Sequence, residues 1–180
     1  LVAMRFGIAI TSITLYPFGG IAALTEIPRE PAREILIAIA GPLVNFVIAA
    51  GLFVGVSFLL PTEQLGLAEL SGSDLLRSLF SANLLLGLFN LIPAYPMDGG
   101  RILRGVLATR MPYLAATRWA ARIGKLFAAL FVGAGVMLQD WWLPILGVFL
   151  FMGATSEEQS TAVHTALSAV RIRDVLITEY

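Results

Sequence analysis

The chain has 180 residues, of which 58% are hydrophobic and only 13% are charged. Soluble domains carry roughly 25% charged residues, so this composition indicates a protein embedded in the lipid bilayer. Positive and negative charges cancel, which argues against a nucleic-acid partner. There is no cysteine, and this excludes disulfide bonds and thiolate metal sites.

The N-terminal residues predict the end of a helix. The segment Leu1 to Gly7, LVAMRFG, carries Arg5 in its last turn, and Gly7 can cap it. No basic segment with a cleavage site precedes the first apolar run, so we expect no signal peptide. We therefore expect the sequence to begin inside a longer protein.

The next segment has the character of strands. Ile8 to Leu24 is rich in Ile, Thr and Tyr and alternates loosely in polarity. Pro17, Gly19 and Gly20 mark a turn within it. The segment predicts a β-hairpin or a re-entrant strand, and the simplest interpretation is an ordinary hairpin at the membrane surface.

Apolar segments in the rest of the chain predict membrane helices. Ile35 to Leu60 has no charged residue and is long enough to cross a bilayer core of roughly 30 Å. We expect Gly41-Pro42 to interrupt it, and Gly51 and Gly55 to form a face for close helix packing. Three shorter segments follow: 79–92, 126–138 and 143–154. The predicted fold class is an α-helical membrane protein with about four transmembrane helices and an N-terminal β-hairpin or re-entrant strand element.

The charges predict how these helices cross the membrane. Every charged residue from Arg101 to Lys125 is basic, whereas the loop 61–77 is mainly acidic. Basic loops stay on the cytoplasmic side, and we interpret the arginines of 101–125 as such topological signals. We expect a multi-pass protein of the cell membrane. His164 then falls on a polar helix outside the spans, as a surface residue rather than a zinc ligand.

Asn90 to Arg101, NLIPAYPMDGGR, is the most informative stretch. Pro93 and Pro96 cannot continue a regular helix, so we expect a helix to end near Leu91. Irregular backbone at membrane depth must be buried in protein or line a wet cavity. A carboxylate there, Asp98, costs roughly 2.5–3.5 kcal/mol on insertion scales, and such residues are usually functional.

This stretch resembles a signature of the site-2 protease family of intramembrane zinc metalloproteases, N-x-x-P-x-x-P-x-D-G. Met97 stands where leucine is usual. Other elements follow in the family's order. LVAMRFG resembles the tail of the zinc-binding helix, GPLVN (residues 41–45) matches a G-P-x-x-N element, and VRIRDVLITEY (170–180) resembles the start of a CBS domain.

The resemblance implies roles for particular residues. Asp98 would be the third ligand of a catalytic Zn²⁺, Asn90 would help to hold the substrate carbonyl, and Asn45 would lie near the active site. The edge strand around residues 18–20 (Phe18, Gly19, Gly20) would pair with an unfolded substrate, because strand addition grips a peptide by its main chain. The implied substrates are membrane-spanning proteins, namely membrane-tethered regulators.

The family's H-E-x-x-H motif does not occur in these residues, which contain a single histidine. We expect the motif upstream, and we expect this chain alone to be inactive. The predicted domains are an N-terminally truncated membrane domain, 1–155, and a cytoplasmic linker with the start of a CBS domain, 156–180. Two alternatives remain open: a non-catalytic relative that binds transmembrane partners, and a transporter or channel subunit in which Asp98 relays protons or ions.

Overall fold

A computed structural model of the chain describes residues 10–16, 19–24, 30–59 and 72–169. Two strands and five helices succeed one another in these residues. They are β1 (Ile10–Tyr16), β2 (Gly19–Leu24), α2 (Pro31–Leu59), α3 (Gly72–Asn90), α4 (Asp98–Ala108), α5 (Tyr113–Leu138) and α6 (Trp142–Ala169). The predicted helix end at 1–7, most of the acidic loop and the CBS-like end lie outside the described residues.

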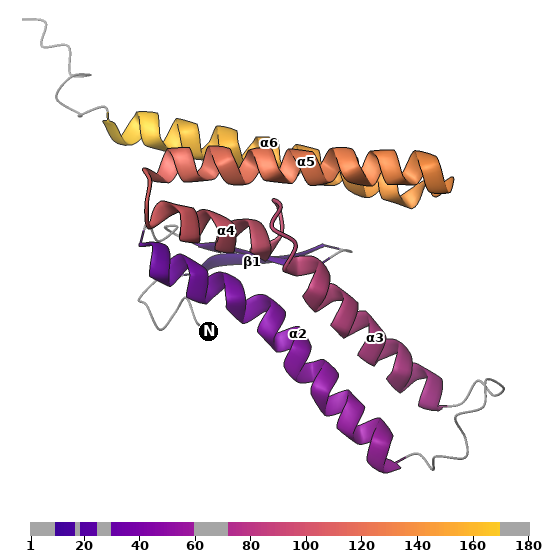
Figure 1. Cartoon of the computed structure of the whole chain (residues 1–180). Coiled ribbons are helices and arrows are strands. Elements are labelled where there is room, and N and C mark those ends of the chain that lie inside the picture. The colour runs from indigo at the N-terminus through magenta and orange to yellow at the C-terminus, as the bar shows by residue number, and fades with distance from the viewer. Residues whose placement is uncertain (1–9, 17–18, 25–29, 60–71, 170–180) are drawn as a thin grey trace, which may run out of the picture.

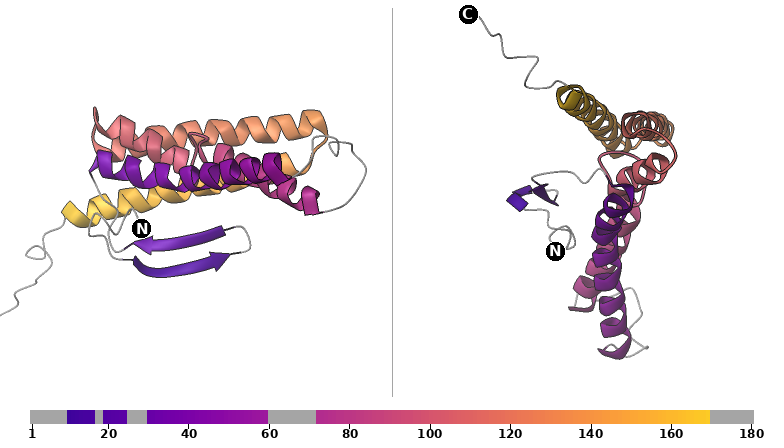
Figure 2. Two further views of the ribbon diagram at one scale, coloured as in Figure 1. Left: turned by 90° about the horizontal axis from the view of Figure 1, so that it is seen from below. Right: turned by 90° about the vertical axis from the view of Figure 1, so that its left-hand side faces the viewer.

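The two strands form an antiparallel pair. The register runs from Ile10 opposite Leu24 to Tyr16 opposite Gly19. Both strands fall within the segment whose alternation predicts a hairpin. The pair lies to one side of the helices, as the right-hand view of Figure 2 shows.

Helices α2 and α3 lie side by side and diverge from the other helices toward one end of the molecule (Figure 1). The predicted interruption at Gly41-Pro42 is wrong, because α2 continues through the buried Pro42. A membrane helix tolerates such a proline where neighbouring groups take up the freed backbone. The predicted packing face is also wrong for the described residues, since a Cβ placed on Gly51 or Gly55 meets nothing within 4 Å. The close approach occurs at Gly87, where a Cβ would lie 2.9 Å from the Phe46 ring.

Helices α5 and α6 pack against each other along their length, and α4 lies between this pair and α2 (Figure 1). Small residues let the two backbones approach, as is usual for helices in membranes. The buried face of α5 is made of such residues: Ala116, Thr117, Ala120, Ala121, Gly124, Ala128 and Gly135. The chain turns between α5 and α6, with Gln139 in the left-handed conformation and Asp140 Oδ1 accepting a hydrogen bond from the Trp142 N–H at 2.8 Å.

Several helices are longer than the apolar segments predict. Helix α3 begins at Gly72 rather than at residue 79, and α5 begins at Tyr113 and includes much of the basic segment. Helix α6 continues without a break through position 155, the predicted domain boundary. Within the described residues, two helices are long and apolar enough to cross a membrane, Pro31–Gly55 and Tyr113–Leu138.

The backbone between α3 and α4 forms part of the core. Helix α3 ends at Asn90, as the prolines predict, and residues 91–97 are irregular. Ala94, Tyr95 and Met97 in this stretch are buried and pack against α5 and α6. Gly99 allows α4 to fold back on the end of α3, because a Cβ there would collide with the carbonyl groups of Leu91 and Ile92.

Replacing Gly99 by alanine should therefore destabilise the protein by about 1–3 kcal/mol, the usual cost of overpacking. Gly133→Ala is the matched control, since a Cβ at that position in α5 meets nothing within 4 Å and alanine favours a helix. Thermal unfolding in detergent measures both. Equal unfolding temperatures for the two variants would contradict the close approach at Gly99.

Candidate functional site

Asp98 is the first residue of α4, directly after the irregular stretch. The stretch is closed by short-range backbone hydrogen bonds, from Met97 N to Ala94 O at 3.0 Å and from Gly100 N to Met97 O at 3.1 Å. These bonds fix where α4 begins. A carboxylate in the first turn of a helix is favoured by the partial positive charge of that terminus.

The Asp98 carboxylate lies against α2. Its Oδ2 atom is 2.5 Å from the place that a Cβ on Gly41 would occupy, so only glycine leaves room for it. Asp98 is half-buried, and within the described residues no side chain or backbone group forms a hydrogen bond or ion pair with its carboxylate. The structure thus places Asp98, the predicted zinc ligand, next to Gly41, the first residue of the GPLVN element. The carboxylate oxygens of Asp98 are not engaged by other described residues.

The two predicted asparagines belong to the helices that flank Asp98. Asn45 lies one turn after Gly41 on α2 and therefore on the same helix face. Asn90 is the last residue of α3, where the irregular stretch begins. Both are half-buried, and among the described residues neither side chain has a hydrogen-bond partner. Asparagine in a membrane helix often forms a hydrogen bond to a neighbouring helix, and Asn45 forms no such bond among the described residues.

The predicted substrate-binding residues of the hairpin lie apart from Asp98. Gly19 and Gly20 begin β2, opposite Tyr16 and Leu15, and the hairpin stands beside the helical bundle (Figure 2). Phe18 lies outside the described residues. His164 is exposed on α6, in agreement with the surface position predicted for it.

The residues that the structure describes can supply only part of the ligand set of a zinc ion. No group of three or more histidine, cysteine, aspartate or glutamate residues gathers in the part of the chain that the structure describes. Asp98 has the right chemistry for one ligand, because carboxylate oxygen binds zinc well and the space beside it is kept open by Gly41. If Asp98 binds zinc, the remaining ligands would have to come from outside the described residues.

Sequence reasoning missed a buried charge cluster further along α4. Arg104 is 1% exposed, and its Nε donates a 2.6 Å hydrogen bond to Glu34 Oε1 in the first turn of α2. Its Nη1 atom donates at 2.6 Å to Glu157 Oε1 on α6. The topological interpretation of the basic segment is therefore wrong for Arg104, whose charge is used inside the protein.

Two aromatic rings complete this Arg104 cluster, which we define as Glu34, Tyr95, Arg104, Tyr113 and Glu157. The guanidinium carbon lies 4.9 Å from the centre of the Tyr113 ring and 5.4 Å from that of Tyr95, within the range of cation–π attraction. Burial by itself lowers the pKa of Arg104, but the surrounding tyrosine and glutamate side chains raise that pKa above its ordinary value. The guanidinium is therefore charged.

The Arg104 cluster determines where α4 lies relative to α2 and α6. One side chain connects both helices and the buried Tyr95 of the irregular stretch. A second ion pair, Lys125 Nζ to Glu158 Oε2 at 2.8 Å, connects α5 with α6 one position further along. Because Asp98 begins α4 and Gly41 belongs to α2, the cluster also fixes the placement of the Asp98 carboxylate.

The fold and the site define a helical protein with candidate membrane spans and a carboxylate presented by irregular backbone between helices. Residues 62–131 match peptidase family M50. A zinc metalloprotease of Methanocaldococcus jannaschii is 38% identical over 175 residues, which cover 97% of this chain and 49% of that protein. Rip3 of Mycobacterium tuberculosis is 32% identical over 186 residues, which cover 99% of this chain and 46% of that protein.

A solved structure resembles the chain as well. The site-2 protease from Methanocaldococcus jannaschii is 41% identical, with a TM-score of 0.69 over 87% of this chain and 68% of that one. The chain belongs to the site-2 protease family, peptidase family M50. It spans about half the length of the two relatives described above.

Arg104→Met should destabilise the protein by about 3–5 kcal/mol, because it leaves Glu34 buried without its cation. Arg110→Met is the control, since Arg110 is exposed and its loss should change the free energy of unfolding by less than about 0.5 kcal/mol. Equilibrium unfolding in mixed detergent measures both variants. Adding Glu34→Leu to Arg104→Met should restore part of the loss, and a double variant no more stable than Arg104→Met would contradict the pairing.

Proposed function

We propose that this chain is the Asp98-bearing part of an intramembrane zinc metalloprotease that cleaves transmembrane segments of membrane-tethered regulatory proteins. The observation that carries the proposal is the Asp98 carboxylate, which has no hydrogen-bond or ion-pair partner in the described residues and lies at the start of α4 against Gly41. Membership of the family supports the class of reaction, and the candidate spans support its location in the bilayer. We place the protein in the cell membrane as a multi-pass protein.

Asp98 is proposed as one of three protein ligands of the zinc. When bound, such an ion lowers the pKa of a water molecule toward 7 and polarises the scissile carbonyl. The chain contains one histidine, which is exposed on α6, so the other two ligands are expected from residues beyond these 180. The chain alone should therefore not cleave a substrate.

The asparagines and the hairpin are proposed to handle the substrate. The Asn90 side-chain amide can donate to the oxygen on which negative charge develops, and Asn45 lies on the Gly41 face of α2, close to the same space. The hairpin containing Gly19 and Gly20 would hold the unwound substrate by main-chain pairing, which exposes a peptide bond that a helix would bury. Part of the irregular backbone of residues 91–97 is buried against α5 and α6, as non-helical backbone at membrane depth must be unless it lines a wet cavity.

Asp98→Ala should abolish cleavage of a transmembrane test substrate by the protein in its natural full length. Asn90→Ala should lower the rate roughly 10²–10³-fold, the usual effect of losing one oxyanion donor. Asn83→Ala is the matched control on α3, because the Asn83 amide only donates to Leu79 O within its own helix. Full activity in a folded Asp98→Ala protein would overturn the proposal in favour of a non-catalytic or transport role.

Gly41→Ala should reduce cleavage without unfolding the protein, because the new Cβ displaces the Asp98 carboxylate. A displacement of about 1 Å at a catalytic group can cost roughly 10²-fold in rate. Gly51→Ala makes the same chemical change on the same helix in open space, and it should leave the rate unaltered. If both variants cleave at the wild-type rate, Gly41 does not control the position of Asp98.

A further inference from the structure

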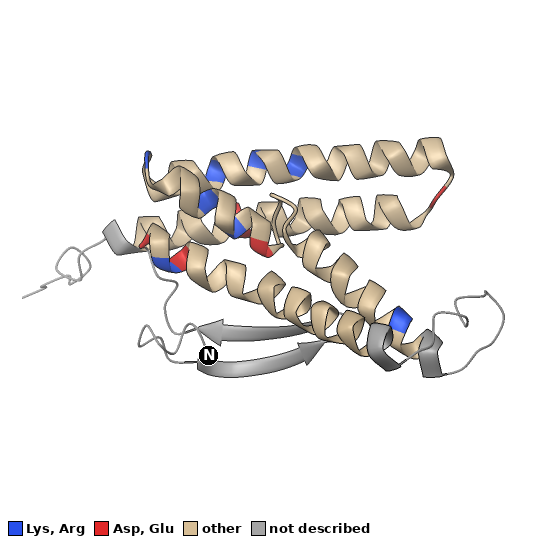
Figure 3. Ribbon diagram, turned by 60° about the horizontal axis from the view of Figure 1, so that its bottom comes forward, with Lys and Arg blue, Asp and Glu red and all other residues tan. Residues whose placement is uncertain are grey.

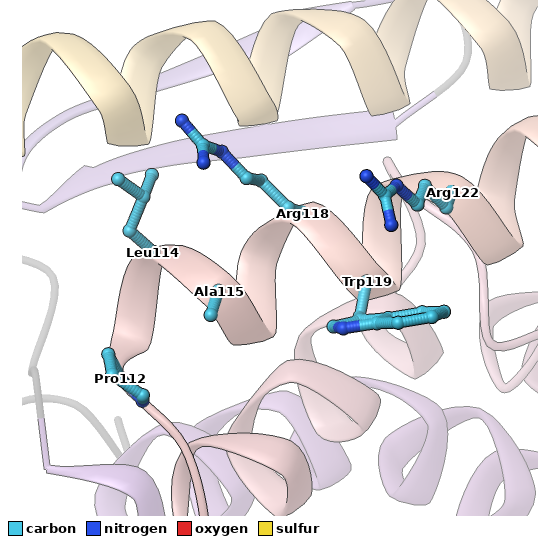
Figure 4. Close-up of a pocket in the computed structure, with 6 residues that line it drawn as sticks. All are labelled: Pro112, Leu114, Ala115, Arg118, Trp119 and Arg122. Carbon is cyan, nitrogen blue, oxygen red and sulfur yellow. The ribbon is translucent and has the colours of Figure 1, made fainter.

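A second site lies on the first turns of α5, away from Asp98. A pocket of about 280 Å³ is lined by Pro112, Leu114, Ala115, Arg118, Trp119 and Arg122. Figure 4 shows Arg118 and Arg122 extending to the same side of α5, with the Trp119 ring next to Arg122. This volume is at the lower limit of ligand pockets, so it suits a small charged group rather than a large molecule.

The pocket is a concentration of unneutralised positive charge. No acidic residue occurs between Arg101 and Lys125. Two cations of that segment are paired inside the protein, Arg104 with glutamates of α2 and α6, and Lys125 with Glu158. Arg118 and Arg122 form no ion pair within the described residues, and Arg122 instead lies 5.1 Å from the centre of the Trp119 ring.

The helix terminus adds to the attraction for an anion. Helix α5 has no acidic residue in its first turn, and Pro112, which precedes it, supplies no side-chain cap. The N–H groups of this turn therefore lack side-chain acceptors and contribute partial positive charge on the wall formed by residues 112–115. Each of the two planar guanidinium groups beside such a terminus can donate a pair of N–H groups to two oxygens of a phosphate.

The position of the pocket on α5 identifies the source of the phosphate. Helix α5 is a candidate membrane span. Its uncharged part runs from Leu126 to Leu138 and begins one turn after Arg122. Most of the basic residues that the structure describes lie toward this end of the bundle (Figure 3). Trp119 is half exposed, and tryptophan favours the boundary between headgroups and acyl chains.

We propose that this pocket binds the phosphate of an anionic membrane phospholipid, with Arg118 and Arg122 as the phosphate ligands and Trp119 against the upper acyl chain. Basic pockets beside membrane helices bind anionic headgroups in this way. The site requires only that α5 crosses the membrane, so it does not depend on the proposed proteolysis. It anchors α5, and through the α5–α6 contact it holds the end of the bundle that carries the Arg104 cluster.

The test uses the natural full-length protein in nanodiscs of phosphatidylcholine containing a minor fraction of phosphatidylglycerol. Native mass spectrometry counts the phosphatidylglycerol molecules that remain bound to the protein after it is released from the nanodisc. Arg118→Gln and Arg122→Gln should each weaken retention roughly fivefold, and the double variant roughly thirtyfold, on the usual contribution of one basic residue near a membrane surface. Arg77→Gln on α3 also removes one arginine that has no ion pair in the described residues, and it should retain lipid like the wild type.

Two results would overturn the proposal. One is equal retention by the double variant and the wild type while both have the same unfolding temperature in pure phosphatidylcholine. The other is displacement of the lipid by millimolar inorganic phosphate, or equal stabilisation of the protein by phosphate in pure phosphatidylcholine discs. That second result would assign the pocket to a free anion rather than a lipid.

Discussion

The burial of one guanidinium is the constraint on which the rest of the structure depends. Arg104 is 1% exposed and must have partners, because an unpaired charge in the interior is very costly. Its partners come from four separate parts of the chain: Glu34 lies in the first turn of α2, Tyr95 belongs to the irregular stretch, Tyr113 begins α5, and Glu157 lies in the second half of α6. Satisfying Arg104 therefore requires α2, α4 and α6 to meet at one end of the bundle, and α6 to continue as a helix beyond its apolar part.

That arrangement also places the irregular stretch and Asp98 relative to α2. Two prolines end α3, and glycines allow α4 to start against the backbone it has just left, so that Asp98 emerges at a helix start next to Gly41. The carboxylate keeps its oxygens free because its neighbour on α2 has no side chain. The Arg104 cluster holds α4 in place two turns away from Asp98, while the space beside the Asp98 carboxylate stays open. In this account the metal ligand and its support occupy the two halves of one short helix.

Local features of the fold could be predicted from the sequence, and long-range ones could not. Pro93 and Pro96 predict the end of α3, because prolines act on the backbone within a few positions. The Arg104 cluster could not be predicted, since Glu34 and Arg104 are 70 positions apart and no periodicity connects them. The sequence contained one signal of the cluster, an arginine inside the otherwise apolar run 102–107. The topological interpretation counted this arginine with the other basic residues and so missed it. Helices α3 and α5 begin earlier than expected because charged residues stand between their first residues and their apolar runs, and a search for apolar segments stops at those charges. Asn45, Asn90 and Asp98 were found by motif, and what the structure adds is the contact of Asp98 with Gly41.

The most direct test of the central claim is the distance between a carboxylate oxygen of Asp98 and the metal in an experimental structure of the natural full-length protein with zinc bound. A zinc–oxygen ligand distance is about 2.0–2.2 Å, and the account predicts a value in that range with α4 beginning at Asp98 beside Gly41. A zinc ion with a complete ligand set and with Asp98 more than about twice that distance away would contradict it. Asp98 would then need another role, and the open space beside Gly41 another explanation.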